Sequence, residues 1–246
     1  MKASVAQFRF DEGTRHLKAG VTNGSDQDIV VSRATIRWDG LAFRSVRLPA
    51  DVVHPGQTAA FDIEYGAAGC DRRPVGRPVL VADVDGRERR LPLTVDNPGL
   101  LGRLHVQACA ERRLAGNAEV RLEPGPRTEE LRGEEYLPAE LVLQRTDGSE
   151  PVRVVDLGGS VLLELVPRGG QEGLPALLAP DQPRLAFPVL LGSAHRCDAH
   201  ALGQSSQTFL ISAYLRVGDA PVQREVLHLS VADRDRLLAL IRRDCG

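Results

Sequence analysis

The sequence predicts an all-β protein made of two β-sandwich domains in tandem. Three observations support this prediction. Short runs of apolar and β-branched residues alternate with turns along the chain, which holds 24 glycines and 16 prolines in 246 residues. The same order of turns, strands and cysteines occurs twice. Helical spacing of apolar residues is confined to the end of each half, an arrangement typical of sandwiches with helices at the domain ends.

The expected strands can be placed in order from their apolar pattern. Val5, Phe8 and Phe10 among polar residues predict an opening strand, and the β-branched run 30–38 ends at the turn dipeptide Asp39-Gly40. A hairpin is expected wherever two such runs flank a short glycine turn. Hairpins are therefore predicted from 79–84 with 90–95 and, in the second half, from 208–217 with 223–231.

Each half is expected to end in a short helix. Leu237 and Leu240 recur at helical spacing after the acidic start Asp233, which predicts a helix over Ala232 to Arg243. Its counterpart in the first half is Pro98 to Ala110.

Four matches in the same order indicate an internal duplication. An opening strand (7–13 and 119–125), a turn before an apolar strand (22–31 and 146–155), a proline turn leading to a cysteine (55–71 and 180–198) and a closing segment (95–109 and 231–245) each occur twice. The duplication predicts domains at residues 1–115 and 116–246. The paired acids Glu129-Glu130 and Glu134-Glu135 are expected in a solvated stretch between the domains.

Two of these turns resemble a known kind of domain. The residues that carry the resemblance are Asn23-Gly24-Ser25 followed by Ile29 and Val31, and Pro55-Gly56-Gln57 followed by Phe61 and Ile63. They resemble the bacterial immunoglobulin-like domains of secreted and surface proteins, and the two-domain pattern resembles secreted proteins of high-GC Gram-positive bacteria. The resemblance implies an immunoglobulin-like fold for each half and implies no active site.

The four cysteines allow three pairings, and the duplication selects one of them. It pairs Cys70 with Cys109 and Cys197 with Cys245, one disulfide in each domain. The alternative is four reduced, buried cysteines in a cytoplasmic protein. Disulfides persist in oxidising compartments, so we expect a secreted or cell-envelope protein from which an export segment has been removed. The start of the chain shows no apolar signal segment.

Composition excludes several classes of partner. The net charge is −2 with interspersed signs, which argues against nucleic acid as a partner, and no stretch has the roughly 20 apolar residues of a transmembrane helix.

Two single features are expected to be structural. Asn23-Gly24-Ser25 is formally a glycosylation sequon, but a turn explains it. Trp38, the sole tryptophan, is expected in the core because it ends a strand.

One segment has the residue types of a metal site. His195, Cys197, Asp198 and His200 lie within six residues, and such side chains bind zinc or copper. A disulfide-bonded Cys197 could not act as a ligand, so a disulfide loop with exposed histidines is the favoured alternative, with His195 and His200 as the remaining metal candidates. The chain carries no catalytic or cofactor-binding motif of the familiar kinds, and no cofactor is predicted.

The leading hypothesis is therefore a non-enzymatic exported protein that binds a protein or cell-envelope partner or acts as a spacer. The second is a metal- or redox-handling envelope protein that uses the segment His195 to His200. The third is an enzyme whose site is assembled from distant residues.

Overall fold

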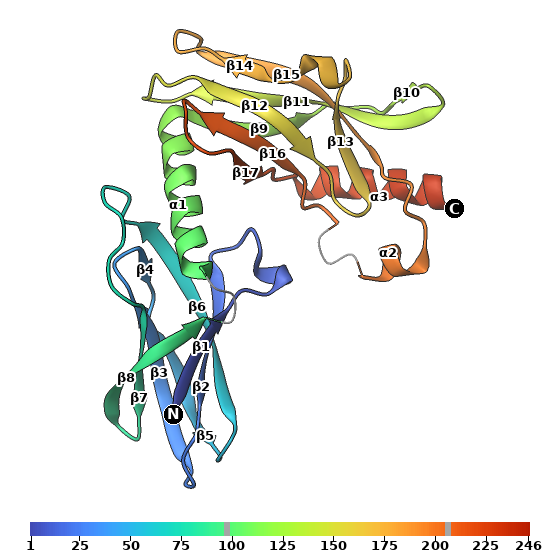
Figure 1. Cartoon of the computed structure of the whole chain (residues 1–246). Coiled ribbons are helices and arrows are strands. Elements are labelled where there is room, and N and C mark those ends of the chain that lie inside the picture. The colour runs from blue at the N-terminus through green and yellow to red at the C-terminus, as the bar shows by residue number, and fades with distance from the viewer. Residues whose placement is uncertain (96–98, 205–207) are drawn as a thin grey trace. The chain divides into compact units, whose positions relative to one another are not determined.

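The computed structural model describes residues 1–95, 99–204 and 208–246. The chain divides into two compact units, Met1–Cys109 and Ala110–Gly246 (Figure 1). This division falls inside helix α1 (Leu100–Asn117). The expectation that residues 1–115 and 116–246 are the two domains stays a prediction.

The first unit is a sandwich of two four-stranded layers, ordered β4-β6-β2-β1 and β8-β7-β3-β5. Strand β1 pairs antiparallel with β2 and parallel with β8, so it connects the layers along one edge. Alternate residues point inward; in β6, for example, Ala59, Phe61 and Ile63 are buried. The strands are β1 (Lys2–Ala6), β2 (His16–Thr22), β3 (Ile29–Arg37), β4 (Leu41–Phe43), β5 (Val46–Val53), β6 (Thr58–Ala68), β7 (Val79–Val84) and β8 (Arg87–Val95).

The second unit has the layers β9-β11-β15-β13 and β14-β12-β16-β17, with β10 paired to β11. Its core is built mainly from leucine and valine on the facing sides of the two layers. The strands are β9 (Ala118–Pro124), β10 (Glu129–Leu131), β11 (Glu134–Arg145), β12 (Val152–Gly158), β13 (Leu163–Pro167), β14 (Ala176–Leu178), β15 (Arg184–Ser193), β16 (Ser212–Val217) and β17 (Gln223–Val226).

The two units have the same strand order, although the opening strand of the first unit is β1 and not the predicted residues 7–13. The layer β4-β6-β2-β1 corresponds strand by strand to β13-β15-β11-β9, and β5-β3-β7-β8 corresponds to β14-β12-β16-β17. Each unit is therefore an immunoglobulin-like sandwich with the same topology. Both predicted disulfides are present, Cys70–Cys109 in the first unit and Cys197–Cys245 in the second.

The helices largely follow the predicted positions. Helix α3 (Val231–Cys245) begins after Ser230, whose side chain accepts a hydrogen bond from the backbone N–H of Asp233. Helix α1 continues to Asn117, beyond the predicted end at Ala110, because Leu114 is buried in the core of the second unit; Pro98 lies outside the described residues. The short helix α2 (Ala199–Gln204) was not expected. Two 3-10 turns, η1 (Arg9–Asp11) and η2 (Gln171–Gly173), complete the elements.

Two expectations are wrong. Strand β1 ends at Ala6, and the chain then turns through η1, so Phe8 and Phe10 are 48% and 59% exposed and stack on each other. The paired acids do not form a linker between domains. They lie on β10 and β11, which are joined by a two-residue turn at Arg132 and Gly133, both with positive φ (57° and 86°), as a tight hairpin of this kind requires.

Equivalent ends of the two sandwiches are closed by different polar side chains. In the first unit the fully buried Asn23 follows β2, and its Nδ2 donates to the carbonyls of Gln27 (2.7 Å) and Val53 (2.8 Å). In the second unit Arg145, at the end of β11, donates to the carbonyls of Glu150 (2.7 Å) and Ala179 (2.6 Å). Because its amide is buried and bonded, Asn23 is a structural residue of the turn, as the turn reading of the sequon predicted.

Candidate functional site

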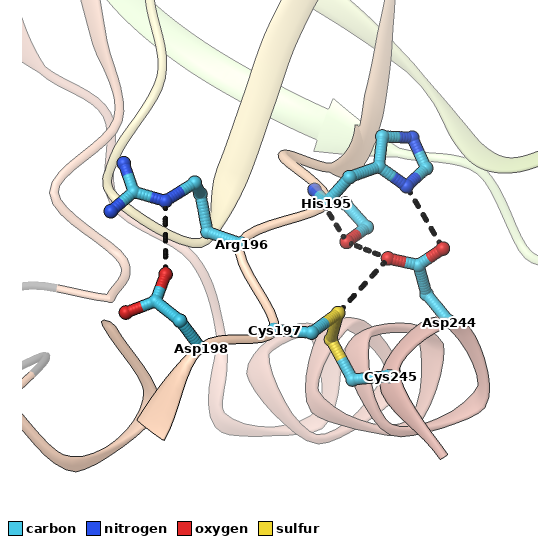
Figure 2. Close-up of a disulfide and its surroundings, with 7 residues drawn as sticks. His195, Arg196, Cys197, Asp198, Asp244 and Cys245 are labelled. Carbon is cyan, nitrogen blue, oxygen red and sulfur yellow. Dashed lines mark hydrogen bonds and ion pairs between the residues drawn. A yellow bond between two sulfur atoms is a disulfide. The ribbon is translucent and has the colours of Figure 1, made fainter. Parts of the chain in front are cut away.

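The segment predicted as a metal candidate follows β15 and leads into α2. His195 has a φ of 53°, which turns the chain sharply after Ser193. Cys197 is then bonded to Cys245, the last residue of α3 (Figure 2). The exposed His200 lies on α2. Among the described residues, neither His195 nor His200 belongs to a group of three potential ligands with donor atoms within 4.8 Å of one another.

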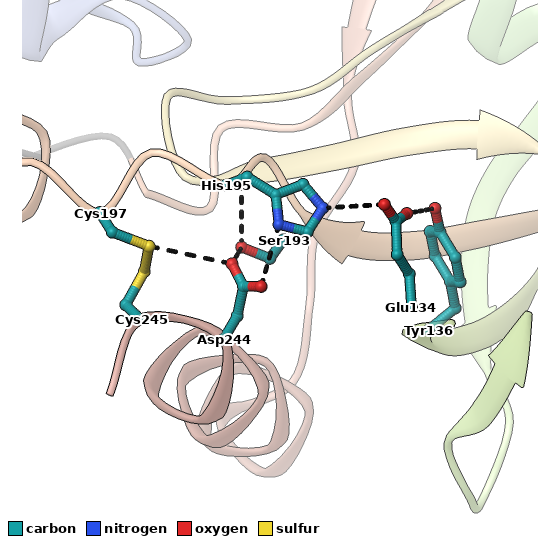
Figure 3. Close-up of polar contacts among 7 residues, drawn as sticks. All are labelled: Glu134, Tyr136, Ser193, His195, Cys197, Asp244 and Cys245. Atoms are coloured by element: carbon teal, nitrogen blue, oxygen red, sulfur yellow. Dashed lines mark hydrogen bonds and ion pairs between the residues drawn. A yellow bond between two sulfur atoms is a disulfide. The ribbon is translucent and has the colours of Figure 1, made fainter. Parts of the chain in front are cut away.

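His195 instead joins a network of side chains from three elements. Its Nδ1 lies 2.9 Å from Oδ1 of Asp244 in the last turn of α3, and its Nε2 lies 3.5 Å from Oε1 of Glu134 at the start of β11. Ser193 Oγ donates to Asp244 Oδ2 at 2.6 Å, and Tyr136 Oη donates to Glu134 Oε2 at 2.6 Å (Figure 3). We call these five residues the His195 network.

The carboxylates of this network determine the charge state of its other members. The hydrogen bond that the His195 ring donates to Asp244 raises the pKa of His195, and the negative charges of Glu134 and Glu164 add to the shift, so the imidazolium form is favoured. The hydrogen bond to Glu134 raises the pKa of Tyr136, with burial and Glu164 adding to it, so the phenol stays protonated. The acids of the network therefore favour the protonated form of the imidazole and the neutral form of the phenol.

Ser193, His195 and Asp244 do not have the geometry of a catalytic triad with a serine nucleophile. In a Ser-His-Asp triad the imidazole nitrogen contacts the serine Oγ and removes its proton. Here the Ser193 Oγ donates to the Asp244 carboxylate and accepts only the backbone N–H of His195 at 3.1 Å. Both ring nitrogens of His195 face carboxylates. The arrangement positions Asp244 and does not activate Ser193.

A hollow of about 260 Å³ opens beside the network. Its wall includes an ion pair in which the Arg243 guanidinium contacts both oxygens of Glu135 at 2.8 Å. That contact lowers the pKa of Glu135, chiefly through the hydrogen bond from Arg243. The hollow is smaller than a typical small-molecule site of about 300–1,000 Å³. It is lined by Gly133, Glu134, Glu135, Tyr136, Ser193, His195, Leu240, Arg243 and Asp244.

No family model matches the chain, and no curated protein matches it in sequence. Solved structures give weak similarities. A chain of the CsuC-CsuE chaperone-tip adhesion subunit pre-assembly complex from archaic chaperone-usher Csu pili of Acinetobacter baumannii is 11% identical, with 87% of this chain and 90% of that chain covered and a TM-score of 0.22. The Pseudomonas aeruginosa CupB2 chaperone is 15% identical, with 88% and 94% covered and a TM-score of 0.24.

A third similarity is to the exo-chitosanase CsxA of Amycolatopsis orientalis, which is 13% identical, with 89% of this chain and 26% of that chain covered and a TM-score of 0.19. At TM-scores this low none of the three bears on function. The fold is immunoglobulin-like because of its strand order.

The first disulfide has a different neighbourhood. His105 Nε2 lies 3.6 Å from Cys109 Sγ and 3.0 Å from the carbonyl oxygen of Gly69. Trp38 is half-buried against the same core and meets the His105 ring edge-on at 6.0 Å, in agreement with its predicted place in the core. Both disulfides thus have a histidine nearby, but Cys197–Cys245 also has a carboxylate.

Sequence reasoning missed Ser193, Asp244, Glu134 and Tyr136 as site residues. Asp244 could have been found, because it directly precedes Cys245 and the predicted disulfide places it beside Cys197. Glu134 could not, since its predicted place was a linker, and nothing in the sequence distinguished Tyr136.

Proposed function

We propose that this chain is a non-enzymatic exported or cell-envelope protein that serves as a binding or structural module for a protein partner. The observation that carries the proposal is the disulfide in each sandwich. In both units it ties the segment after β6 or its counterpart β15 to the closing helix, and the paired cysteines are 39 and 48 positions apart in the sequence. Cross-links over loops of this length stabilise a fold by about 4 kcal/mol, and they persist only where the surroundings are oxidising.

A binding role is supported by the site in the second unit. The His195 network gathers charged groups at the rim of a small hollow, and its serine is held by a carboxylate. Three acids, Glu134, Glu135 and Asp244, line this hollow against two basic side chains, His195 and Arg243, which leaves an excess of acidic groups. Such a surface suits a cationic side chain of a protein partner. No helix in the described part of the chain has both the length and the apolar character of a membrane span.

The source that the resemblance suggested, a high-GC Gram-positive bacterium, is part of the same proposal. Arginine in place of lysine is the supporting feature, since Lys2 and Lys18 are the only lysines.

The experiment that tests the compartment is thiol counting in fractionated cells that express the native gene. Each fraction is alkylated before and after reduction, and the mass of the chain is measured. We expect the protein outside the cytoplasm with all four cysteines protected until a reductant is added. A cytoplasmic protein with four alkylated cysteines before reduction would overturn the proposal.

The binding role is tested by cross-linking in intact cells with the wild-type chain and with the Glu134→Gln and Glu119→Gln variants. Glu119 is an exposed acid on β9 outside the hollow. We expect a cross-linked partner that is lost with Glu134→Gln and kept with Glu119→Gln. Equal cross-linking of both variants would exclude the hollow as the binding surface.

A further inference from the structure

We propose that the Cys197–Cys245 disulfide is reversible and that its reduced form, together with Asp244, is a zinc site. The inference goes beyond the binding role, and it adds to the proposed compartment a thiol reductant that opens Cys197–Cys245. It replaces the histidine pair that the sequence favoured with two thiolates and a carboxylate that only the fold brings together. Cys197, Asp244 and Cys245 form the one group of three potential ligands, with donor atoms within 4.8 Å of one another, in the part of the chain that the structure describes.

The spacing suits a tetrahedral ion. With Zn–S distances of about 2.3 Å, two thiolates on one zinc lie about 3.8 Å apart. The two cysteine Cα atoms are 5.2 Å apart, so rotation of the side chains can open the sulfurs to that separation. Asp244 Oδ2 lies 3.9 Å from Cys197 Sγ. A disulfide sulfur carries no proton, so in the oxidised state this is a packing contact. In the reduced state the same two atoms would both be zinc ligands.

Asp244 is already held in place for this role. Ser193 Oγ donates to its Oδ2, and the His195 ring contacts its Oδ1. Hydrogen bonds of this kind orient a ligating carboxylate and are part of many metal sites. Ser193 and His195 are therefore positioning residues, and the fourth zinc position is left for water or an external ligand.

The surroundings favour a cation and admit a reductant. Cys245 is the last residue of α3, a helix of 15 residues, and the negative end of a helix dipole stabilises a positive ion. Cys197 is exposed, so a small thiol can reach the bond. In the reaction a dithiol reduces the disulfide to two thiols and is itself oxidised to a cyclic disulfide. Zn²⁺ then binds both sulfurs and displaces their two protons into solvent.

The first disulfide is a built-in control. Cys70 and Cys109 have His105 nearby, but among the described residues they are part of no group of three ligand atoms within 4.8 Å. The test therefore compares two variants of the full chain. The variant C70S/C109S keeps the second cysteine pair, and C197S/C245S keeps the first.

Each protein is reduced with a phosphine, which does not compete for the metal as a dithiol would, and is titrated with Co²⁺ and then Zn²⁺. We expect reduced C70S/C109S to bind one Co²⁺ per chain with a thiolate-to-cobalt charge-transfer band that Zn²⁺ abolishes. The oxidised protein and reduced C197S/C245S are expected to show no such band. Should the first unit of C70S/C109S unfold, the Co²⁺ band still reports on the site, because Cys197, Asp244 and Cys245 all lie in the second unit.

Two further variants test the named roles. Asp244→Asn is expected to weaken Zn²⁺ binding at least about 10-fold, and Ser193→Ala about 10-fold through loss of positioning, with the Co²⁺ band retained. Equal metal binding by both cysteine variants, no band in the reduced protein, or unchanged affinity in Asp244→Asn would overturn the proposal. Loss of circular dichroism when C70S/C109S is reduced would also overturn it, because this variant has only the second disulfide to lose and the ligands would no longer be held together.

Discussion

Removal of the Cys70–Cys109 disulfide provides a quantitative test of the fold. The bond joins residues 39 apart, and chain-entropy arithmetic for a loop of this length gives about 4 kcal/mol at 25 °C. A single domain is commonly stable by about 5–15 kcal/mol, so C70S/C109S should leave the first unit marginally stable. The loop closed by Cys197–Cys245 is 48 residues, and because the entropy varies with the logarithm of length the value is nearly the same.

Trp38 makes the measurement specific to the first unit. It is the only tryptophan, and it packs against the core that contains Cys70 and Cys109. For a urea dependence of about 2 kcal/mol per molar, a loss of 4 kcal/mol moves the midpoint of the fluorescence transition down by roughly 2 M. Reduced wild type should unfold at the same urea concentration as C70S/C109S. A midpoint shift below about 0.5 M with an unchanged slope would refute the reasoning.

Three further predictions concern buried or half-buried polar groups. Asn23→Asp puts a carboxylate oxygen against the carbonyls of Gln27 and Val53 and should lower the unfolding free energy of the first unit by about 3 kcal/mol, measured with Trp38 fluorescence. Arg145→Met leaves backbone carbonyls without donors and should cost about 3 kcal/mol, measured by far-UV circular dichroism, whereas Arg145→Met with wild-type stability would contradict the assigned closure of the sandwich end. Burial raises the pKa of Glu225, with Glu111 adding to the shift, so its favourable contribution is present at low pH and is lost as the pH rises from the unfolded-state pKa through the folded-state pKa. Glu225→Gln should therefore raise Tm near pH 7 and change it little near pH 4, and equal effects at both pH values would exclude this cause.

Much of the architecture could be predicted because it depends on the order of residues along the chain. Turns, proline positions and cysteines recur at matching places, and a duplicated order implies a duplicated topology without knowledge of any contact. The pairing of Cys70 with Cys109 and of Cys197 with Cys245 followed from that order alone. The closing helix at Ala232 to Arg243 was visible because Leu237 and Leu240 keep a helical spacing.

Predictions from local sequence pattern were wrong where contacts with residues outside the pattern decide where a strand or helix ends. Phe8 and Phe10 alternate like strand residues, yet the chain turns after Ala6, where Thr14 Oγ1 donates to the Asp11 carbonyl, and both rings are exposed. Helix α1 extends past Ala110 because Leu114 is buried in the second unit's core, and a partner of that kind is invisible in a short window of sequence.

Sequence by itself determined the two sandwiches and their covalent links, because strand alternation, turn chemistry and cysteine order are properties of neighbouring residues and of their repetition. Only the tertiary structure decided the site. Glu134, Ser193 and Asp244 come from the start of one strand, the end of another and the last turn of a helix. A hydrogen bond joins Ser193 to Asp244, and Glu134 contacts His195. Such contacts depend on how the strands and α3 pack, which residue order alone does not specify.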